Sequence, residues 1–484
     1  MITQFSYTQL SNVNGWIKRI RDIGLKIFMK KRYDEVMDEV AKDVGLQQRT
    51  QRVFGIGEKF VGAMSYTSQQ QQSSNLVFQG FVNTLYKDAG GERMISNSAL
   101  IKQLKKPETL EFLKGMIDMH NALMLLKRPK YGYTTSVDKI CKIAGVRDCV
   151  NVDGTYIGVM HSDKYECRAE KDAAGLGLHC LTSDKTGTIV SFEITQAASN
   201  ERLYVPIGDI HDVLIMADRG YPSYLIFVRL LARDLSHNVK FIFRAEPQWK
   251  MTIDSAINAN GCPIALDDVK GDIDVSDLAN HFIDMQVRIQ RPKSYKASEV
   301  PEKEIALRLV RVYRPHDKSW AYYVTNISPE TMSVRMFPQV YRLRWICEQI
   351  YKCAKSYTSM AKGINSRHFS IVMFFIVASI CVMAIRTIMA AYMRPDKGKT
   401  LSLIKVHKHI GSFTLIFRDV VKISIDKVLR RLRAEARILT RICLSSSVSK
   451  RDKMRLSSYQ AVFEKIMAIL RLDGIEVEAF TSVA

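Results

Sequence analysis

The amino-acid sequence predicts an α/β protein in which helices flank a mixed β-sheet, with a mainly β insertion and helical regions towards both ends of the chain. From about residue 147, apolar and polar residues alternate as they do in strands, first in consecutive strands and then in strands separated by helices. Before residue 145 and after residue 396, apolar residues recur at helical spacing. A mixed sheet between two helical regions explains both patterns.

The charge of the chain indicates a polyanionic partner. The 484 residues include 71 Lys and Arg against 49 Asp and Glu, a formal net charge of +22. Such an excess favours nucleic acid first and an anionic membrane surface second, and a merely basic surface is the third interpretation. The N-terminal segment lacks a continuous apolar core, so we predict that it is not a secretory signal.

Nine scattered cysteines form no CxxC pair, which argues against a zinc ribbon and against a disulfide framework. Reduced thiols in a cytoplasmic protein are the simplest explanation. Two of these cysteines, Cys347 and Cys353, lie next to or near an acidic residue that becomes important below, and we expect their oxidation to inactivate the protein.

These patterns divide the chain into five parts. The helical first part carries basic patches and is interpreted as a DNA-end-binding region, with a structural helical cap as the alternative. The basic helices of the last part suit DNA contact, self-association or a plain solvated face. The parts are residues 1–145 (helical), 146–245 (first part of the α/β core), 246–325 (mainly β insertion), 326–395 (second part of the core, with a charged helix and a buried apolar helix) and 396–484 (helical and basic).

One segment has to be tested as a membrane span. From Phe369 to Ile385 the chain runs for 17 residues without a charge, and Arg386 follows. This length is at the lower limit for crossing a bilayer. A helix buried on all sides in a large domain has the same composition. We predict a core helix and no membrane partner.

Within the core, the segment CVNVDGTYIGVM predicts a strand around Asp153. LGLHCLTSDKTGTIVSFEITQ predicts two strands joined by a turn at Ser183–Gly187, and a short helix or loop is expected at Asn200–Ile207. DVLIMADRGYPSYLIFVRLLARD predicts a buried strand at Val213–Ala217, Asp218 at its end, a turn, and an amphipathic helix. Further strands are predicted at VKFIFRA, HFIDMQVRIQ, EIALRLVRVYR and SWAYYVTNIS.

A charged helix is predicted from Val340 to Tyr357, VYRLRWICEQIYKCAKSY. Spacings of three and four residues place five polar side chains on one stripe. These are Tyr341, Arg344, Glu348, Lys352 and Lys355. A second stripe is apolar and suited to packing, and it comprises Leu343, Ile346, Ile350, Tyr351 and Ala354. One carboxylate among cations fits a site that holds a divalent metal and a polyanion, although a solvated helix with a Glu–Lys pair has the same pattern.

Three carboxylates carry the chemical prediction: Asp153 within a strand, Asp218 at the end of a strand, and Glu348 on the charged helix. A charge within an apolar strand is costly to bury unless it is paired or metal-bound. Oxygen ligands select hard cations, so Mg²⁺ or Mn²⁺ is the expected occupant. Two such ions roughly 3.5–4 Å apart can activate a water or 3′-hydroxyl and stabilise the leaving oxygen of a phosphodiester.

These residues carry a resemblance to a known family. VDGTYIG, ADRGY and the spacing Y-x2-R-x3-E-x6-K of Tyr341, Arg344, Glu348 and Lys355 resemble the signature of the DDE transposases, specifically insertion-sequence family four with its YREK motif. The resemblance covers roughly residues 147–390. It implies an RNase H-like catalytic core that excises a mobile element and reinserts it into DNA, by phosphodiester hydrolysis and transesterification.

The resemblance also implies roles for individual residues. Asp153, Asp218 and Glu348 would hold two Mg²⁺ or Mn²⁺ ions, and Tyr341, Arg344 and Lys355 would bind DNA phosphates, with Lys352 added. The implied partners are double-stranded terminal inverted repeats, target DNA, and a second copy of the chain to pair the two ends. Relatives with this signature form a hairpin and flip a base, for which Trp320 and Trp249 are candidate stacking partners. A cytoplasmic, nucleoid-associated protein is expected.

Other interpretations remain open from the sequence. The same fold supports a nuclease or resolvase that cleaves DNA without joining it. A basic DNA-binding protein without catalysis is a second alternative, and a basic membrane-associated protein that uses Phe369–Ile385 is a third.

Overall fold

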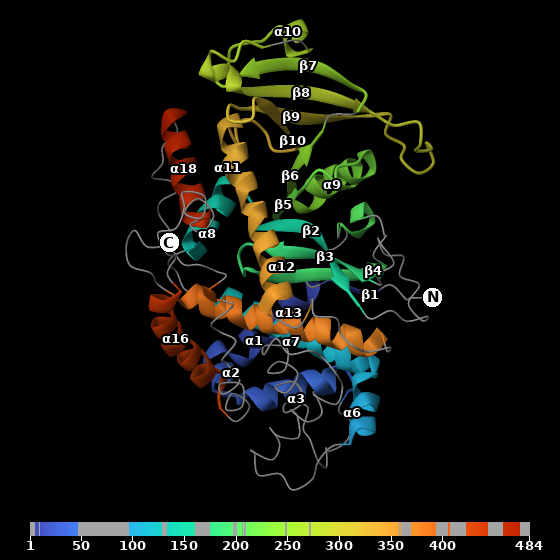
Figure 1. Cartoon of the computed structure of the whole chain (residues 1–484), viewed down its shortest axis with the longest axis vertical. Helices are drawn as coiled ribbons and strands as arrows, with labels where there is room; N and C mark the ends of the chain where they lie inside the picture. Colours follow the sequence, from blue (N-terminus) through green and yellow to red (C-terminus); the bar gives the residue numbers. More distant parts are fainter. Residues whose placement is uncertain are drawn as a thin grey trace.

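One mixed β-sheet runs through the length of the protein and carries helices on both faces (Figure 1). The computed structural model describes a defined set of residues, and every structural statement here refers to them. They are 5–8, 10–46, 96–127, 133–159, 175–196, 201–205, 207, 210–246, 249–270, 273–357, 360, 369–393, 405–406, 423–443 and 458–474.

The sheet has ten strands in the order β1-β4-β3-β2-β5-β6-β10-β9-β8-β7. Strands β2, β5 and β6 are parallel to one another, and the other neighbouring pairs are antiparallel. The strands are β1 (Phe5–Thr8), β2 (Asp148–Gly158), β3 (Gly175–Ser183), β4 (Thr188–Gln196), β5 (Val213–Ala217), β6 (Val239–Ala245), β7 (Met251–Asn258), β8 (Phe282–Gln290), β9 (Glu304–Arg314) and β10 (Ser319–Thr325). The predicted mixed sheet flanked by helices is therefore confirmed.

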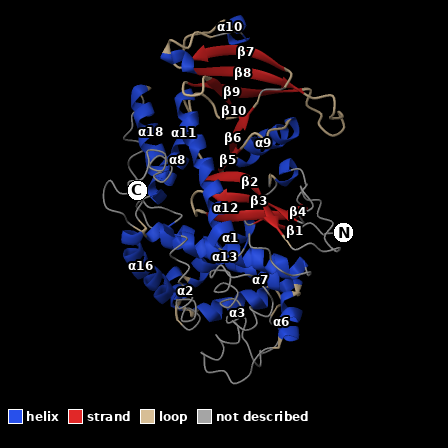
Figure 2. Ribbon diagram, viewed as in Figure 1, coloured by secondary structure: helices blue, strands red, loops and turns tan. Residues whose placement is uncertain are grey.

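Most of the helices gather at the end of the molecule away from β7, as Figure 2 shows. Those of the N-terminal region are α1 (Leu10–Ile23), α2 (Leu25–Lys30), α3 (Tyr33–Asp43), α6 (Asn97–Leu104), α7 (Pro107–Lys127) and α8 (Tyr133–Ile143). Later in the chain come α9 (Tyr224–His237), α10 (Leu266–Lys270), α11 (Phe337–Tyr341), α12 (Trp345–Tyr357), α13 (Phe369–Tyr392), α16 (Ile425–Ile442) and α18 (Ser458–Leu472). Short 3₁₀ helices are η2 (Glu201–Tyr204), η3 (Leu278–His281), η4 (Val334–Met336) and η5 (Arg342–Arg344).

The alternation of side chains along the strands divides the core into two layers. In β5, Leu214 and Met216 pack with α7, α12 and α13 on one face of the sheet. Ile215 and Ala217 point to the opposite face and pack with Phe227 of α9. Both faces of the central strands are thus covered, which is why β5 reads as a continuous apolar run.

The strands at 246–325 extend the same sheet. β10 pairs with β6, and β9, β8 and β7 follow outward from it. The predicted β-rich stretch therefore continues the central sheet through β10, the strand predicted from SWAYYVTNIS.

Two features of the fold differ from the sequence-based expectations. The N-terminal part contains a strand, β1, which pairs with β4 at one edge of the sheet through partners about 190 residues away, such as Phe5 and Ile194. A pairing so distant in sequence leaves no local pattern. The charged segment Val340–Tyr357 is also not one continuous α-helix, because the 3₁₀ turn η5 separates α11 from α12.

Helix α13 extends the predicted apolar segment to Tyr392. It is long and apolar enough to cross a membrane, but 94% of its most apolar window is buried inside the protein. It packs along α7, which is itself buried over most of its length (Figure 1). This burial is what the core-helix prediction requires.

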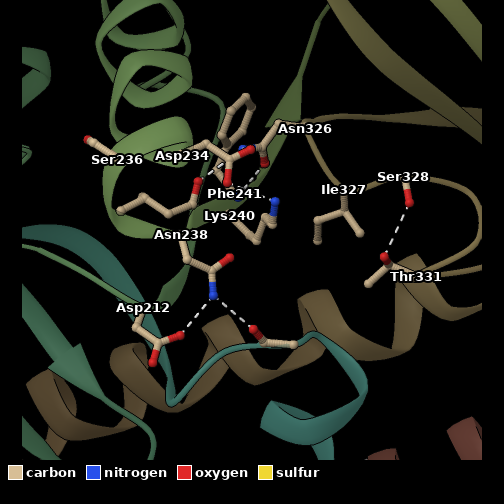
Figure 3. Close-up of polar contacts among 12 residues, drawn as sticks. Asp212, Asp234, Ser236, Asn238, Lys240, Phe241, Asn326, Ile327, Ser328 and Thr331 are labelled. Carbon is tan, nitrogen blue, oxygen red and sulfur yellow. Dashed lines mark hydrogen bonds and ion pairs between the residues drawn. The ribbon is translucent and has the colours of Figure 1, made fainter.

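A polar junction fixes the amino ends of the parallel strands (Figure 3). Asn238 adopts a left-handed conformation at φ 51° between α9 and β6, and its amide donates to Asp212 Oδ1 at 2.8 Å. Asn326, just after β10, accepts from the Phe241 backbone at 2.9 Å and donates to Asp234 at 3.0 Å. Asn is among the residues that tolerate this conformation best. The junction holds β5, β6 and β10 in register from the end opposite to Asp218.

A buried ion pair ties the outer strands to the segment that leads into α11. Arg308 of β9 and Asp284 of β8 form two hydrogen bonds of 2.7 Å, and both residues are buried. The Arg308 guanidinium also donates to the carbonyl oxygens of Ile327 and Met332, at 3.1 and 2.8 Å. The charge pair therefore anchors residues 327–332 onto the sheet ahead of α11.

We predict that Asp284→Ala destabilises the protein by about 3–5 kcal/mol, because it leaves the Arg308 charge buried without its partner. The double variant Asp284→Leu, Arg308→Met should cost much less, since no charge is then buried. Urea unfolding of both variants and the wild type would test this. Equal stability of Asp284→Ala and the wild type would contradict the prediction.

Candidate active site

Asp153 and Asp218 lie side by side at the sheet. β2 and β5 are parallel neighbours in which Val152 pairs with Ala217, so the next residue of each strand is one of the two aspartates. The alternation of the strands turns both towards the face covered by α12, because Cys149 and Met216 pack in the layer on that side. The register of one strand pair thus brings together two acids that are far apart in the sequence.

Glu348 reaches the same place from the helical layer. The apolar stripe predicted for α12 packs inward, with Leu343, Ile350, Tyr351 and Ala354 buried. The Tyr351 hydroxyl donates to the Asp153 carbonyl oxygen at 2.7 Å, which fixes α12 against β2 beside the acid. Glu348 itself is exposed at the surface of the site.

The Arg344 guanidinium lies between the three carboxylates. Its Nη1 is 3.6 Å from Asp153 Oδ2, its Nη2 is 3.7 Å from Asp218 Oδ2, and Nη2 also donates to Glu348 Oε1. All three predicted acids therefore lie within a few ångströms of one guanidinium. Four of the seven predicted site residues form this cluster if Arg344 is counted.

Burial and like charge act on Asp153. Removal from water is the main cause that raises its pKa to about 6, and the Glu348 and Glu201 carboxylates add to this effect, while Arg344 and the Gly154 amide oppose it. For Arg344, burial works against the charged form, but the neighbouring acids and the Tyr341 oxygen outweigh it and raise the pKa. The site concentrates negative charge that one cation only partly balances.

Tyr341 is placed differently from the expectation that it contacts phosphate. Its hydroxyl lies 3.3 Å from both Asp218 Oδ1 and the Ala217 carbonyl oxygen, and the ring is partly buried. Burial is the main cause that raises the pKa of the phenol, so it stays protonated and can donate to Asp218. In this structure, Tyr341 positions an acid.

The two lysines occupy the outer part of α12. Lys352 is exposed, and Lys355 is half-buried closer to the acids. Burial lowers the pKa of Lys355, and the Asp153 charge partly offsets this effect. Both remain candidates for phosphate contact, with Lys352 the more accessible one.

The candidate stacking tryptophans are engaged within the protein. Trp320 lies under the Arg311 guanidinium, 3.9 Å from the ring centroid, and against Tyr313. Trp249 packs edge-on against Phe227. Each ring has protein contacts that a flipped base would have to displace.

Cys347 and Cys353 are both fully buried, and burial raises the pKa of each thiol. A buried thiol with a raised pKa reacts slowly with oxidants. The structure therefore contradicts the expectation that oxidation at these positions inactivates the protein.

The sequence did not single out Glu201, the first residue of η2. Its carboxylate lies against the backbone of Gly154, where a Cβ would be 2.9 Å from Oε1. Only the glycine that follows Asp153 hinted at a close approach, and nothing in the sequence said which residue approaches. A fourth acid thus borders the cluster.

The donor chemistry of the cluster fits a hard divalent cation, since Asp153, Asp218 and Glu348 offer only carboxylate oxygens. The Arg344 guanidinium supplies the positive charge at their centre. Among the described residues, no group of three or more His, Cys, Asp or Glu side chains is already closed up as a metal site. A cation would therefore have to take the place of the guanidinium.

Comparison with known proteins connects this geometry to a family. Residues 145–383 match the family model of the transposase DDE domain, which supports a DDE transposase. The matched segment includes Asp153, Asp218 and Glu348. Among solved structures, the chain is similar to a piggyBac transposase in a synaptic complex with hairpin DNA, with a TM-score of 0.36 and 11% identity over 91% of this chain and 84% of that one. No curated protein matches the chain.

We predict that the metal-free protein loses stability as the pH rises, because of Asp153. A carboxyl whose pKa is higher in the folded protein than in the unfolded chain favours folding at low pH, and this contribution disappears as the pH rises from about 4 through about 6. The loss should be on the order of 2–3 kcal/mol. Asp153→Asn should lack it.

Urea unfolding in EDTA at pH 4.5 and pH 7.5 would test this. The variant should gain stability relative to the wild type at the higher pH. A difference between the two proteins that does not change with pH would rule out the effect.

Proposed function

We propose that the protein, with its transposase DDE domain, is a DNA transposase that cleaves the terminal inverted repeats of a mobile element and joins the ends to target DNA. The observation that carries this proposal is the convergence of Asp153, Asp218 and Glu348 on one guanidinium. The three come from a strand, a strand end and a helix, and no structural role explains such a concentration of buried like charge.

The finer assignment is an RNase H-like core of the insertion-sequence family four type. The antiparallel order β4-β3-β2, continued by the parallel strands β5 and β6 with helices on both faces, supports that core. The YREK residues support the family assignment, because Tyr341 and Arg344 contact the acids and Lys355 lies close to Asp153.

Asp153, Asp218 and Glu348 would hold Mg²⁺ or Mn²⁺, with two ions expected. Bound there, such ions supply activation of a water or 3′-hydroxyl and stabilisation of the leaving oxygen. The chain's own residues prepare the site. Tyr341 orients Asp218 through its hydroxyl, Tyr351 fixes the Asp153 backbone, and the packed α12 holds Glu348 in position.

Binding of DNA phosphates is proposed for Arg344, Lys352 and Lys355, with Tyr341 assisting from beside Asp218. All four project from the segment α11–α12 next to the acids, so a scissile phosphate would meet positive charge where the acids act. The net charge of +22 suits long contacts with duplex DNA. We also propose that two copies pair the two element ends and that the protein works at the nucleoid in the cytoplasm.

Neutral replacements of the acids test the proposal. Asp153→Asn, Asp218→Asn and Glu348→Gln should each abolish cleavage of inverted-repeat DNA, while end binding stays largely intact. Asp254→Asn is a control, because this exposed acid lies on the outer strand β7 and pairs with Arg288. Gel assays of cleavage and of binding would separate the two effects.

Normal cleavage by one of the three variants would remove that residue from the site. Integration of cut ends into a supercoiled plasmid would distinguish a transposase from a nuclease. Cleavage without any joining would favour the nuclease, and binding without cleavage would favour a non-catalytic DNA-binding protein.

Loss of phosphate contacts should show in the salt dependence of binding. Lys352→Ala and Lys355→Ala should each weaken binding of element ends and reduce the slope of log K against log salt concentration by about 0.9. Arg344→Ala should act in the same direction. Fluorescence anisotropy at several salt concentrations measures both quantities.

Arg147→Ala is the matched control, since Arg147 is an exposed cation at the opposite end of β2. It should leave the slope unchanged. If the lysine variants keep the wild-type slope, these residues do not contact phosphate.

A further inference from the structure

Glu201 lies beside the three acids although it belongs to neither aspartate motif. Its carboxylate borders the glycines of both motifs: a Cβ on Gly154 would lie 2.9 Å from Oε1, and one on Gly220 would lie 3.8 Å from Oε2. The next residue, Arg202, donates to the Gly220 carbonyl oxygen at 2.6 Å and ties η2 to the turn after Asp218. The fold thus holds Glu201 between the two aspartate segments.

A buried histidine faces the same place. His179 of β3 is paired with Gly154 in the sheet register and is only 4% exposed. Its Nε2 is 2.9 Å from the Thr195 hydroxyl, and its ring stacks on Tyr204 of η2. Its Nδ1 has no hydrogen-bond partner within the described part of the chain, and it lies 3.3 Å from the Cβ position above Gly154.

An unpaired buried ring nitrogen costs roughly 1–3 kcal/mol, so a polar atom of a ligand or a bound water is expected beside it. The Glu201 oxygen and the His179 nitrogen converge on one point over Gly154, immediately next to Asp153. That point is bordered by an oxygen donor, a nitrogen donor and bare backbone. Its chemistry suits a divalent cation or a water bound to one.

We propose that Glu201 is a fourth carboxylate of the active site, which holds a divalent cation together with Asp153, and that His179 positions it. This inference rests on the proposed function, because it requires a cation at Asp153. Two divalent cations carry more positive charge than three carboxylates balance, and a fourth acid at the edge of the cluster supplies the difference.

Gly154 has a steric role in this arrangement. Its φ lies outside the left-handed region, so the backbone does not require glycine. A methyl group there would approach Glu201 Oε1 to less than 3.0 Å, and the flexible end of the Glu201 side chain is the part that can move away. Gly154→Ala should therefore act by displacing the Glu201 carboxylate.

Binding of Mn²⁺ to the full-length protein, followed by the paramagnetic resonance signal of free Mn²⁺, tests the proposal without relying on activity. Glu201→Gln should weaken at least one Mn²⁺ site by about 10-fold or more. Gly154→Ala should weaken the same site, and the double variant should be no worse than Glu201→Gln alone. Glu246→Gln, an exposed acid that pairs with Arg219, should bind as the wild type does.

Wild-type Mn²⁺ affinity and stoichiometry in Glu201→Gln would overturn the role of Glu201. Additive effects in the double variant would overturn the steric role of Gly154. Asp153→Asn distinguishes this inference from the proposed function. If Asp153→Asn loses Mn²⁺ and Glu201→Gln retains it, only the present inference fails; if Asp153→Asn also retains it, the metal site itself is wrong.

Discussion

Repulsion between carboxylates is the constraint on which the site depends. The parallel pairing of β2 with β5 forces Asp153 and Asp218 together, and the packing of α12 adds Glu348. Bringing like charges together in a half-buried place is unfavourable unless a cation lies among them. In this structure the Arg344 guanidinium is that cation, and a divalent metal ion has the charge and ligand preference to replace it.

The remainder of the fold keeps this arrangement rigid. Both faces of the central strands are covered, so β2 and β5 cannot shift register without exposing an apolar layer. The Asn238 and Asn326 junction secures the amino ends of the parallel strands, and the Asp284–Arg308 pair anchors the chain ahead of α11. Each of these contacts lies outside the site and limits the movement of an element that carries an acid.

The sequence predicted those parts of the structure that local patterns encode. The strand around Asp153, the turn that ends in Gly187 at φ 66°, and the long apolar helix α13 follow from alternation, turn chemistry and composition. The predicted association of the three acids came from motif spacing, and the geometry agrees with it. Pattern alone did not yield the pairing of β1 with β4, because its partners are joined only by the folded sheet.

The features that escaped prediction depend on contacts between distant segments. Tyr341 and Arg344 lie on the predicted polar stripe, but the sequence could not say that they face the acids instead of solvent. The break at η5 is a detail of backbone geometry that apolar spacing does not reveal. Glu201 stands in a short 3₁₀ helix with no motif of its own, and only the folded chain shows that it lies against Gly154.

The most direct test is a structure of the protein with Mn²⁺ and element-end DNA, using the anomalous signal of manganese to locate the ions. The ions should lie among the carboxylates of Asp153, Asp218 and Glu348, with the Arg344 guanidinium displaced from its central position towards a phosphate. Manganese bound elsewhere, or a guanidinium still between the three acids while DNA occupies the site, would contradict the proposed mechanism.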